Sequence, residues 1–139
     1  MSTTPNETIA KRFLFEHNQA DYLASLDQLT TTDCRFHEYL PGLLEPMDRA
    51  IYNQFIAGFR AAIPDIQNSL EELIDNGDKI VMRWRGHGSH TGAELMGIPA
   101  RGTKVTAHGI YILHLRNGKI TEVWNHWDNA NVQQQLNAD

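Results

Sequence analysis

The residue of this sequence best suited to acid–base chemistry is Asp128, which closes the stretch 124–128. A carboxyl group can remove a proton from a carbon beside carbonyl groups and then protonate the new alkoxide. A free Asp, with a pKa of about 3.9, is too weak a base, but an apolar wall raises that pKa by disfavouring the anion. Alternatively, Asp128 caps a helix that begins at Asn129, where amide hydrogen bonds lower its pKa. The sequence leaves both roles open.

His126 is a second candidate, about 6.6 Å from Asp128 along the same face of a strand. We predict that these two groups flank one substrate and that His126 orients or polarises a carbonyl; the alternative is a buried histidine with satisfied hydrogen bonds. A His-x-Asp pair also occurs in the metal-binding triads of non-haem iron enzymes, which usually place another histidine well downstream. No histidine follows Asp128, and nothing makes His87 or His90 converge on it. We therefore predict no metal site.

Two Asn-Gly pairs predict the β-hairpins that position these residues, because Asn-Gly supplies the two positive φ angles of a type I′ turn. The pairs and the strands that they join are Asn76-Gly77 between 66–74 and 80–89, and Asn117-Gly118 between 104–115 and 120–128.

The register of the second hairpin predicts a pocket wall. If Asn117-Gly118 is a two-residue loop, Tyr111 faces Trp124 and Gly109 faces His126. Because side chains alternate along a strand, one face should carry aromatic and apolar groups and end in an imidazole and a carboxylate. Gly109 leaves an open space there. An apolar surface with few polar groups at one end is typical of a ligand pocket. The predicted face comprises Ala107, Gly109, Tyr111, Leu113, Trp124, His126 and Asp128, and the opposite face His108, Ile110, Ile112, His114, Val123, Asn125 and Trp127.

Helical segments precede the hairpins. The sequence 4–7 has the pattern of a capping box with Pro at the first helical position. A second helix is predicted over 21–29 and a short strand over 34–37. A third helix should begin at Asp48 and end at Pro64, with apolar residues at helical spacing: Ile51, Phe55, Ile56, Phe59 and Ile63. Helices followed by antiparallel strands predict an α+β fold, one domain over 1–139, with the sheet wrapped around the helices.

Composition narrows the function classes. The chain has 12 Lys and Arg against 17 Asp and Glu, a net charge of −5. Because a nucleic-acid partner requires a clustered basic surface, we predict none. The N-terminal segment lacks the pattern of a signal peptide, and no apolar run is long enough for a membrane span. Cys34, the one cysteine, cannot form an internal disulfide. We therefore predict a cytoplasmic protein without a membrane partner.

Several short segments resemble the SnoaL-like polyketide cyclase family, of the nuclear-transport-factor-two-like superfamily. The resemblance covers roughly residues 7–136. The matching segments are Phe36-His37 with Pro41-Gly42, Ser89-His90-Thr91-Gly92, Leu95-Met96-Gly97-Ile98-Pro99-Ala100 with Gly102 and Val105, Gly118-Lys119-Ile120, and Trp124 through Trp127-Asp128. The chain departs from the commoner family pattern at Glu38-Tyr39-Leu40, so the substrate shape near His37 is not carried over.

The resemblance implies a cone-shaped, strongly curved antiparallel sheet around the N-terminal helices, enclosing one deep cavity. Characterised members close a ring by intramolecular aldol condensation, without metal or organic cofactor, and use an aspartate as acid/base. That role would fall to Asp128. The family places His37 and His90 near the cavity mouth, where they would contact substrate. Aromatic and sulfur side chains would form the core and line part of the pocket: Phe55, Phe59, Trp84 and Met96.

The predicted function is therefore a cofactor-free polyketide (ester) cyclase acting on a small, apolar, carbonyl-containing ligand. One alternative is a non-catalytic carrier of an apolar metabolite, and another is an isomerase or dehydratase on the same fold, because fold alone does not determine the reaction. We also predict a homodimer or larger oligomer, since an outer sheet face with Ile110, Ile112 and Trp127 needs cover.

Overall fold

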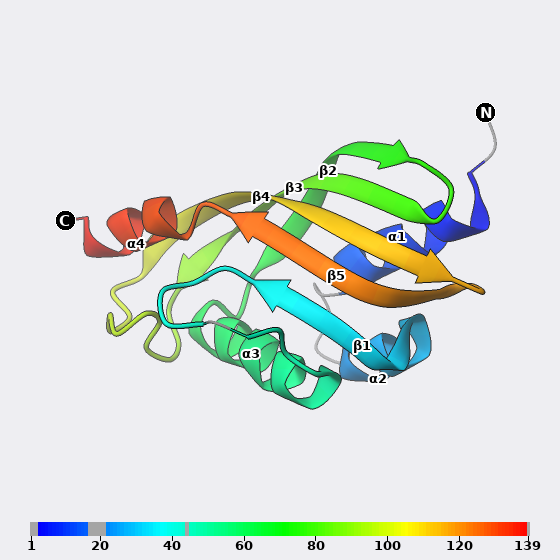
Figure 1. Ribbon diagram of the computed structural model, residues 1–139. Helices are drawn as coiled ribbons and strands as arrows, with labels where there is room; N and C mark the ends of the chain where they lie inside the picture. Colours follow the sequence, from blue (N-terminus) through cyan, green and yellow to red (C-terminus); the bar gives the residue numbers. More distant parts are fainter. Residues whose placement is uncertain (1–2, 17–21, 44, 139) are drawn as a thin grey trace.

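The computed structural model describes residues 3–16, 22–43 and 45–138. Five strands form one curved, unclosed sheet in the order β1-β5-β4-β3-β2. Helices α1, α2 and α3 lie against one side of this sheet, and α4 lies at its end (Figure 1). The elements are α1 (Pro5–Glu16), α2 (Tyr22–Leu29), β1 (Thr30–Glu38), α3 (Arg49–Ala62), β2 (Gln67–Asp75), β3 (Lys79–His90), β4 (Thr103–Arg116), β5 (Lys119–Trp127) and α4 (Asn129–Asn137). The α+β fold is confirmed, with one departure: β1 runs parallel to β5.

Local signals explain where the helices begin. At α1 the Glu7 amide donates to Thr4 Oγ1 over 3.1 Å, and the Thr4 amide donates to Glu7 Oε2 over 3.2 Å, which is the predicted capping box. Asp48 caps α3 by accepting from the Ile51 amide over 2.8 Å. Both predicted starts are therefore confirmed.

The inner face of the sheet, toward α1–α3, carries the main core. Its buried side chains include Phe36, Met82, Tyr111, Leu113 and Val123, and the helices contribute Phe13, Leu14 and Tyr52. Cys34 also lies in this core, and burial raises the pKa of its thiol to about 12. A buried thiol of this kind is unreactive. No helix among the described residues is long and apolar enough to cross a membrane.

The first hairpin forms, but Gly77 has a positive φ and Asn76 does not, so the predicted type I′ turn at Asn76-Gly77 is wrong. The second hairpin turns as predicted but pairs differently. Asn117 and Gly118 have φ of 52° and 77°, as a type I′ turn requires. Leu115 pairs with Ile120, whereas His114 already pairs with Glu122, so Thr121 is an extra residue in β5. This β-bulge reverses the faces of the rest of β5, because a slip of one residue turns every following side chain over.

The predicted register of this hairpin is therefore wrong beyond the bulge. Tyr111 pairs with Asn125, Ile112 with Trp124, and Gly109 with Trp127. Val123 and Asn125 are buried on the inner face, whereas His126 is exposed. Trp124 joins the outer face, the side of the sheet turned away from α1–α3, and it stacks there on His37 at 4.9 Å. Side chains alternate along β5 as predicted, but β5 contains one residue, Thr121, more than a regular hairpin with this turn would have.

Candidate functional site

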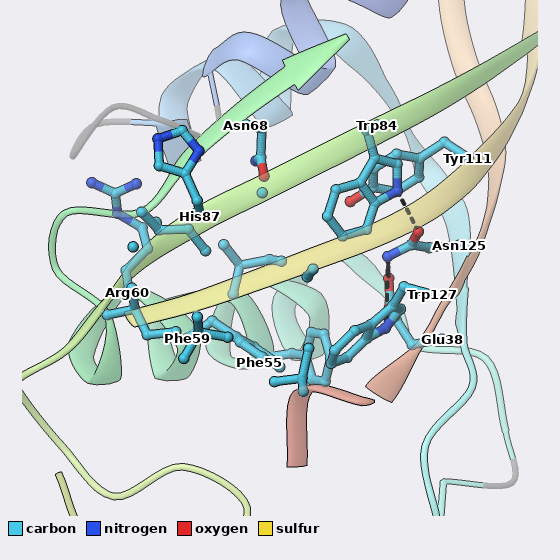
Figure 2. Close-up of a pocket in the computed structure, with 18 residues that line it drawn as sticks. Glu38, Phe55, Phe59, Arg60, Asn68, Trp84, His87, Tyr111, Asn125 and Trp127 are labelled. Carbon is cyan, nitrogen blue, oxygen red and sulfur yellow. Dashed lines mark hydrogen bonds between the residues drawn. The ribbon is translucent and has the colours of Figure 1, made fainter. Parts of the chain in front are cut away.

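A pocket lies between the inner face of the sheet and α3 (Figure 2). Its cavity volume is about 90 Å³. One water molecule needs roughly 10–15 Å³ on the same measure, so the pocket has room for several. Most of its wall is apolar. The lining residues are Glu38, Phe55, Ile56, Phe59, Arg60, Ile63, Ile66, Asn68, Trp84, Gly86, His87, Gly88, Val105, Ala107, Tyr111, Asn125, Trp127 and Val132.

Glu38, the last residue of β1, places a carboxyl group in this wall. Alternation along β1 turns Cys34, Phe36 and Glu38 toward the inner face, and all three are buried. Glu38 is 5% exposed and is the only buried carboxyl group among the residues that the structure describes. Such a group is costly to bury as an anion unless hydrogen bonds satisfy it.

Two donors from β5 hold the Glu38 carboxyl group. Trp127 Nε1 donates to Oε1 over 3.0 Å, and Asn125 Nδ2 donates to Oε2 over 3.0 Å (Figure 2). Burial nevertheless raises the pKa of Glu38 from 4.5 to about 8, since these two hydrogen bonds offset only part of the desolvation. Glu38 is therefore mostly protonated at neutral pH, with the ionised form accessible within about one pH unit.

Trp84 fixes the orientation of the Asn125 side chain. Its indole Nε1 donates to Asn125 Oδ1 over 3.0 Å. Because an indole nitrogen can only donate, the Asn125 amide must turn its oxygen toward Trp84. Its nitrogen therefore faces Glu38. Trp84 and Asn125 are 8% and 5% exposed, so water does not compete freely for these bonds. The result is a continuous chain of donors from Trp84 to the Glu38 carboxyl group.

Gly109 lets the two tryptophans approach each other. A Cβ at this position would lie 2.6 Å from the Trp84 ring and 2.7 Å from Trp127 Cβ. The space predicted at Gly109 is therefore filled by the Trp84 ring and the Trp127 Cβ, and Gly109 pairs with Trp127 instead of His126. The glycine is needed so that both Nε1–H groups can reach the polar end of the pocket.

Gly109→Ala is expected to lower the free energy of unfolding by about 1–3 kcal/mol, because the added methyl group overpacks a rigid contact. Urea denaturation measures this loss. Gly58→Ala in α3 is the matched control, since nothing lies within 4 Å of its added Cβ. That variant should be stabilised by up to about 1 kcal/mol through helix propensity. Equal effects at both glycines would contradict the packing assigned to Gly109.

Asp128 does not lie in the pocket. Its side chain is exposed, and Oδ1 accepts from the Asn131 amide over 3.0 Å at the start of α4. The predicted position in an apolar wall is therefore wrong, and the alternative of a helix cap is confirmed. The cause is that β5 ends at Trp127, so the chain leaves the sheet before Asp128.

The predicted histidines also lie outside the pocket lining. His126 is exposed on the outer face and stacks on Tyr39 at 4.2 Å. His37 Nε2 lies 2.6 Å from Glu122 Oε2 on the same face. His90 is 1% exposed, and its Nε2 is hydrogen-bonded to the Ala93 carbonyl oxygen over 2.8 Å.

Of the apolar residues predicted to bind substrate, four line the pocket and two do not. Tyr111, Phe55, Phe59 and Trp84 belong to the lining. Met96 packs in a second core cluster, and Trp124 faces outward because of the bulge. Within the described part of the chain, no three His, Cys, Asp or Glu side chains are arranged to hold a metal ion.

Sequence reasoning missed Glu38, Asn125 and Trp127 as members of the site. A signal for Glu38 was available, because Cys34 and Phe36 precede it at the alternation of a strand with one buried face. The predicted strand ended one residue too early, at His37. No signal in the sequence marks the bulge that turns Asn125 and Trp127 inward.

The fold and the site define a protein whose curved sheet and helices enclose an apolar pocket with one buried carboxyl group. The sequence pattern of the SnoaL-like polyketide cyclases matches residues 8–136, so the chain belongs to this family. A search of the curated proteins returned no match.

Solved structures support the same fold. IdmH from Streptomyces antibioticus has a TM-score of 0.80 and 25% identity, covering 98% of this chain and 100% of its own. TsrD from Streptomyces laurentii has a TM-score of 0.82 and 22% identity over 100% and 99% of the two chains. A SnoaL-like polyketide cyclase from Agrobacterium tumefaciens has a TM-score of 0.74 and 19% identity over 97% and 99%.

Proposed function

We propose that this protein is a cofactor-free enzyme of the polyketide cyclase type in which Glu38 transfers the proton. The observation that carries the proposal is the buried Glu38 carboxyl group, held by two donors in an otherwise apolar wall. A general acid/base works best when its pKa lies near the working pH. The raised pKa of about 8 brings Glu38 into that range.

The proposed reaction is an aldol ring closure. Ionised Glu38 takes a proton from the carbon beside a substrate carbonyl, and an enolate forms. The enolate carbon bonds to a second carbonyl carbon, whose oxygen becomes an alkoxide. Glu38, now neutral, returns its proton to that alkoxide. Asn125 and Trp127 keep their N–H groups on the carboxyl oxygens, so they stabilise its ionised form during the first step.

Deuterium exchange tests the proton transfer without knowledge of the natural substrate. 2-Acetylnaphthalene is a flat, apolar methyl ketone, and exchange of its methyl protons in D2O is followed by NMR. After subtraction of the exchange in buffer, the protein-catalysed rate should rise with pH and level off above about pH 8, as Glu38 ionises.

The alternatives give different outcomes. A carrier would bind 2-acetylnaphthalene without accelerating exchange, and this result would overturn the enzymatic proposal. An isomerase or dehydratase would use the same first proton transfer and then differ in its product. The cytoplasmic location stays a prediction that rests on the single, unpaired Cys34.

We also propose that the outer face of the sheet forms a homodimer interface. Trp127 points into the pocket instead, but Trp124 takes its place beside Ile112, and Ile110 is 42% exposed. An apolar group of this kind at the centre of a sheet face is typical of an interface.

Ile110→Lys is expected to convert the dimer to a monomer, because it places a charge in the interface. Light scattering measures the mass in solution. Ile51→Lys on α3, at a side chain 51% exposed and away from the sheet, is the control and should leave the dimer intact. A monomeric wild-type protein would contradict the proposal.

A further inference from the structure

The pocket has a second polar end, distant from Glu38. Arg60 in α3 and Asn68 in β2 line this end, and both are half-buried, whereas Glu38 is 5% exposed. Figure 2 shows the Arg60 side chain extending from α3 toward the strands, on the opposite side of the pocket from Glu38. Arg60 and Asn68 therefore stand on the solvent side, and Glu38 at the inner end.

The sheet register gives the separation of the two ends. Asn125, the partner of Glu38, pairs with Tyr111, which pairs with Met82 in β3. Asn68 pairs with Gly86, four residues further along β3, so the two ends are offset by about 13 Å along the strands in addition to their separation across the sheet. Phe55, Phe59 and the Trp84 ring line the pocket between the two ends (Figure 2). The one hydrogen-bond donor among them, Trp84 Nε1, already donates to Asn125. A ligand that reaches both ends is therefore elongated and apolar in its middle.

The chemistry of Arg60 points to an anion. A guanidinium group stays charged at all physiological pH values and has five N–H donors, so it can hold a ligand carboxylate in addition to protein partners. Asn68 adds an amide to the same end of the pocket. Asp65 contributes a carboxylate near this end, close to Gly88, and its Oδ1 accepts from the Ser89 amide over 2.7 Å. His87 also lines this end of the pocket (Figure 2).

We propose that Arg60 and Asn68 form a carboxylate-recognition subsite, and that the substrates are elongated, flat ketones with a carboxylate at the end away from the reacting carbonyl. This inference rests on the proposed function, because Glu38 defines which end of the ligand reacts. The carboxylate at the outer end fixes the ligand so that its ketone lies beside Glu38.

The test compares 6-acetyl-2-naphthoate with its methyl ester, which has the same apolar body and ketone but no charge. Quenching of tryptophan fluorescence reports binding, because Trp84 and Trp127 line the pocket. The wild-type protein should bind the carboxylate about tenfold more tightly than the ester, as expected for a charge-assisted hydrogen bond in a partly buried site. Arg60→Met should abolish this preference while the affinity for the ester stays within about twofold.

Arg85→Met is the matched control, because Arg85 is an exposed arginine of β3 that does not line the pocket. It should leave the preference for the carboxylate unchanged. A wild-type protein that binds the ester as tightly as the carboxylate, or binds neither, overturns the subsite. A carboxylate preference that depends on Arg60, without Glu38-dependent exchange of the acetyl protons, would support the subsite and overturn the proposed function instead.

Discussion

Glu38→Gln is expected to reduce protein-catalysed exchange of the 2-acetylnaphthalene methyl protons by about 10²–10⁴-fold, the usual contribution of a general acid/base. Gln has nearly the same shape as the protonated carboxyl group and can still accept from Trp127 Nε1, but it cannot take up a proton. The affinity for the ketone, measured by fluorescence quenching, should therefore change much less than the exchange rate. A variant with near wild-type exchange would remove Glu38 from the mechanism.

Asp128→Asn is the matched control for this experiment. Asn is as good a helix cap as Asp, so the interaction with the Asn131 amide is retained. Because Asp128 lies outside the pocket lining, the Asp128→Asn variant should catalyse exchange at a rate close to that of the wild type. If Asp128→Asn abolished exchange and Glu38→Gln did not, the aspartate predicted from the family resemblance would be the acid/base after all.

The wild-type protein should lose several kcal/mol of stability between about pH 4.5 and pH 8 because of Glu38. The folded state holds the Glu38 proton up to a pKa of about 8, whereas the unfolded chain releases it at the ordinary value of 4.5. Between these values the folded state binds more protons, so each rise of one pH unit lowers the free energy of unfolding by about 1.4 kcal/mol. The contribution is fully present below pH 4.5 and is lost as the pH rises through about 8.

Urea denaturation at pH 5 and pH 8 measures this effect, with Glu38→Gln as the reference. All other titratable groups are the same in both proteins, so the difference between the two pH dependences reports Glu38. Asp65 and Asp75 do not interfere, because their lowered pKa values lie below the ordinary value of 3.8. A wild-type protein whose stability depends on pH in the same way as that of the variant would show that Glu38 is ionised throughout.

Local features were predictable because they depend on neighbouring residues alone. The capping box of Thr4 and Glu7, the cap at Asp48 and the turn at Asn117-Gly118 all involve residues within three positions of each other. Their energies arise mainly from the local backbone and do not require the rest of the fold. The order of helices and strands follows from these signals, and the α+β class follows from that order.

The site was less predictable because it depends on which of the two alternating sets of β5 side chains faces inward. A single extra residue at Thr121 exchanges the inner and outer faces of β5, which removes Trp124 and His126 from the pocket and brings in Asn125 and Trp127. The turn chemistry predicts the first pairs after the loop and contains no information on a later bulge. The faces of β5 are instead consistent with packing across the sheet, where the Trp84 ring and the Trp127 Cβ crowd Gly109.

The amino-acid sequence by itself determined the family, the order of the elements, the two hairpins and the aromatic character of the pocket, because local propensity and alternation encode these properties. Only the tertiary structure decided which carboxyl group is buried. Glu38 ends β1 and lies buried in the apolar wall, whereas Asp128 follows β5 and is exposed as a helix cap. Desolvation depends on everything that surrounds a group in space, and it raises the pKa of Glu38 into the range that the proposed chemistry needs.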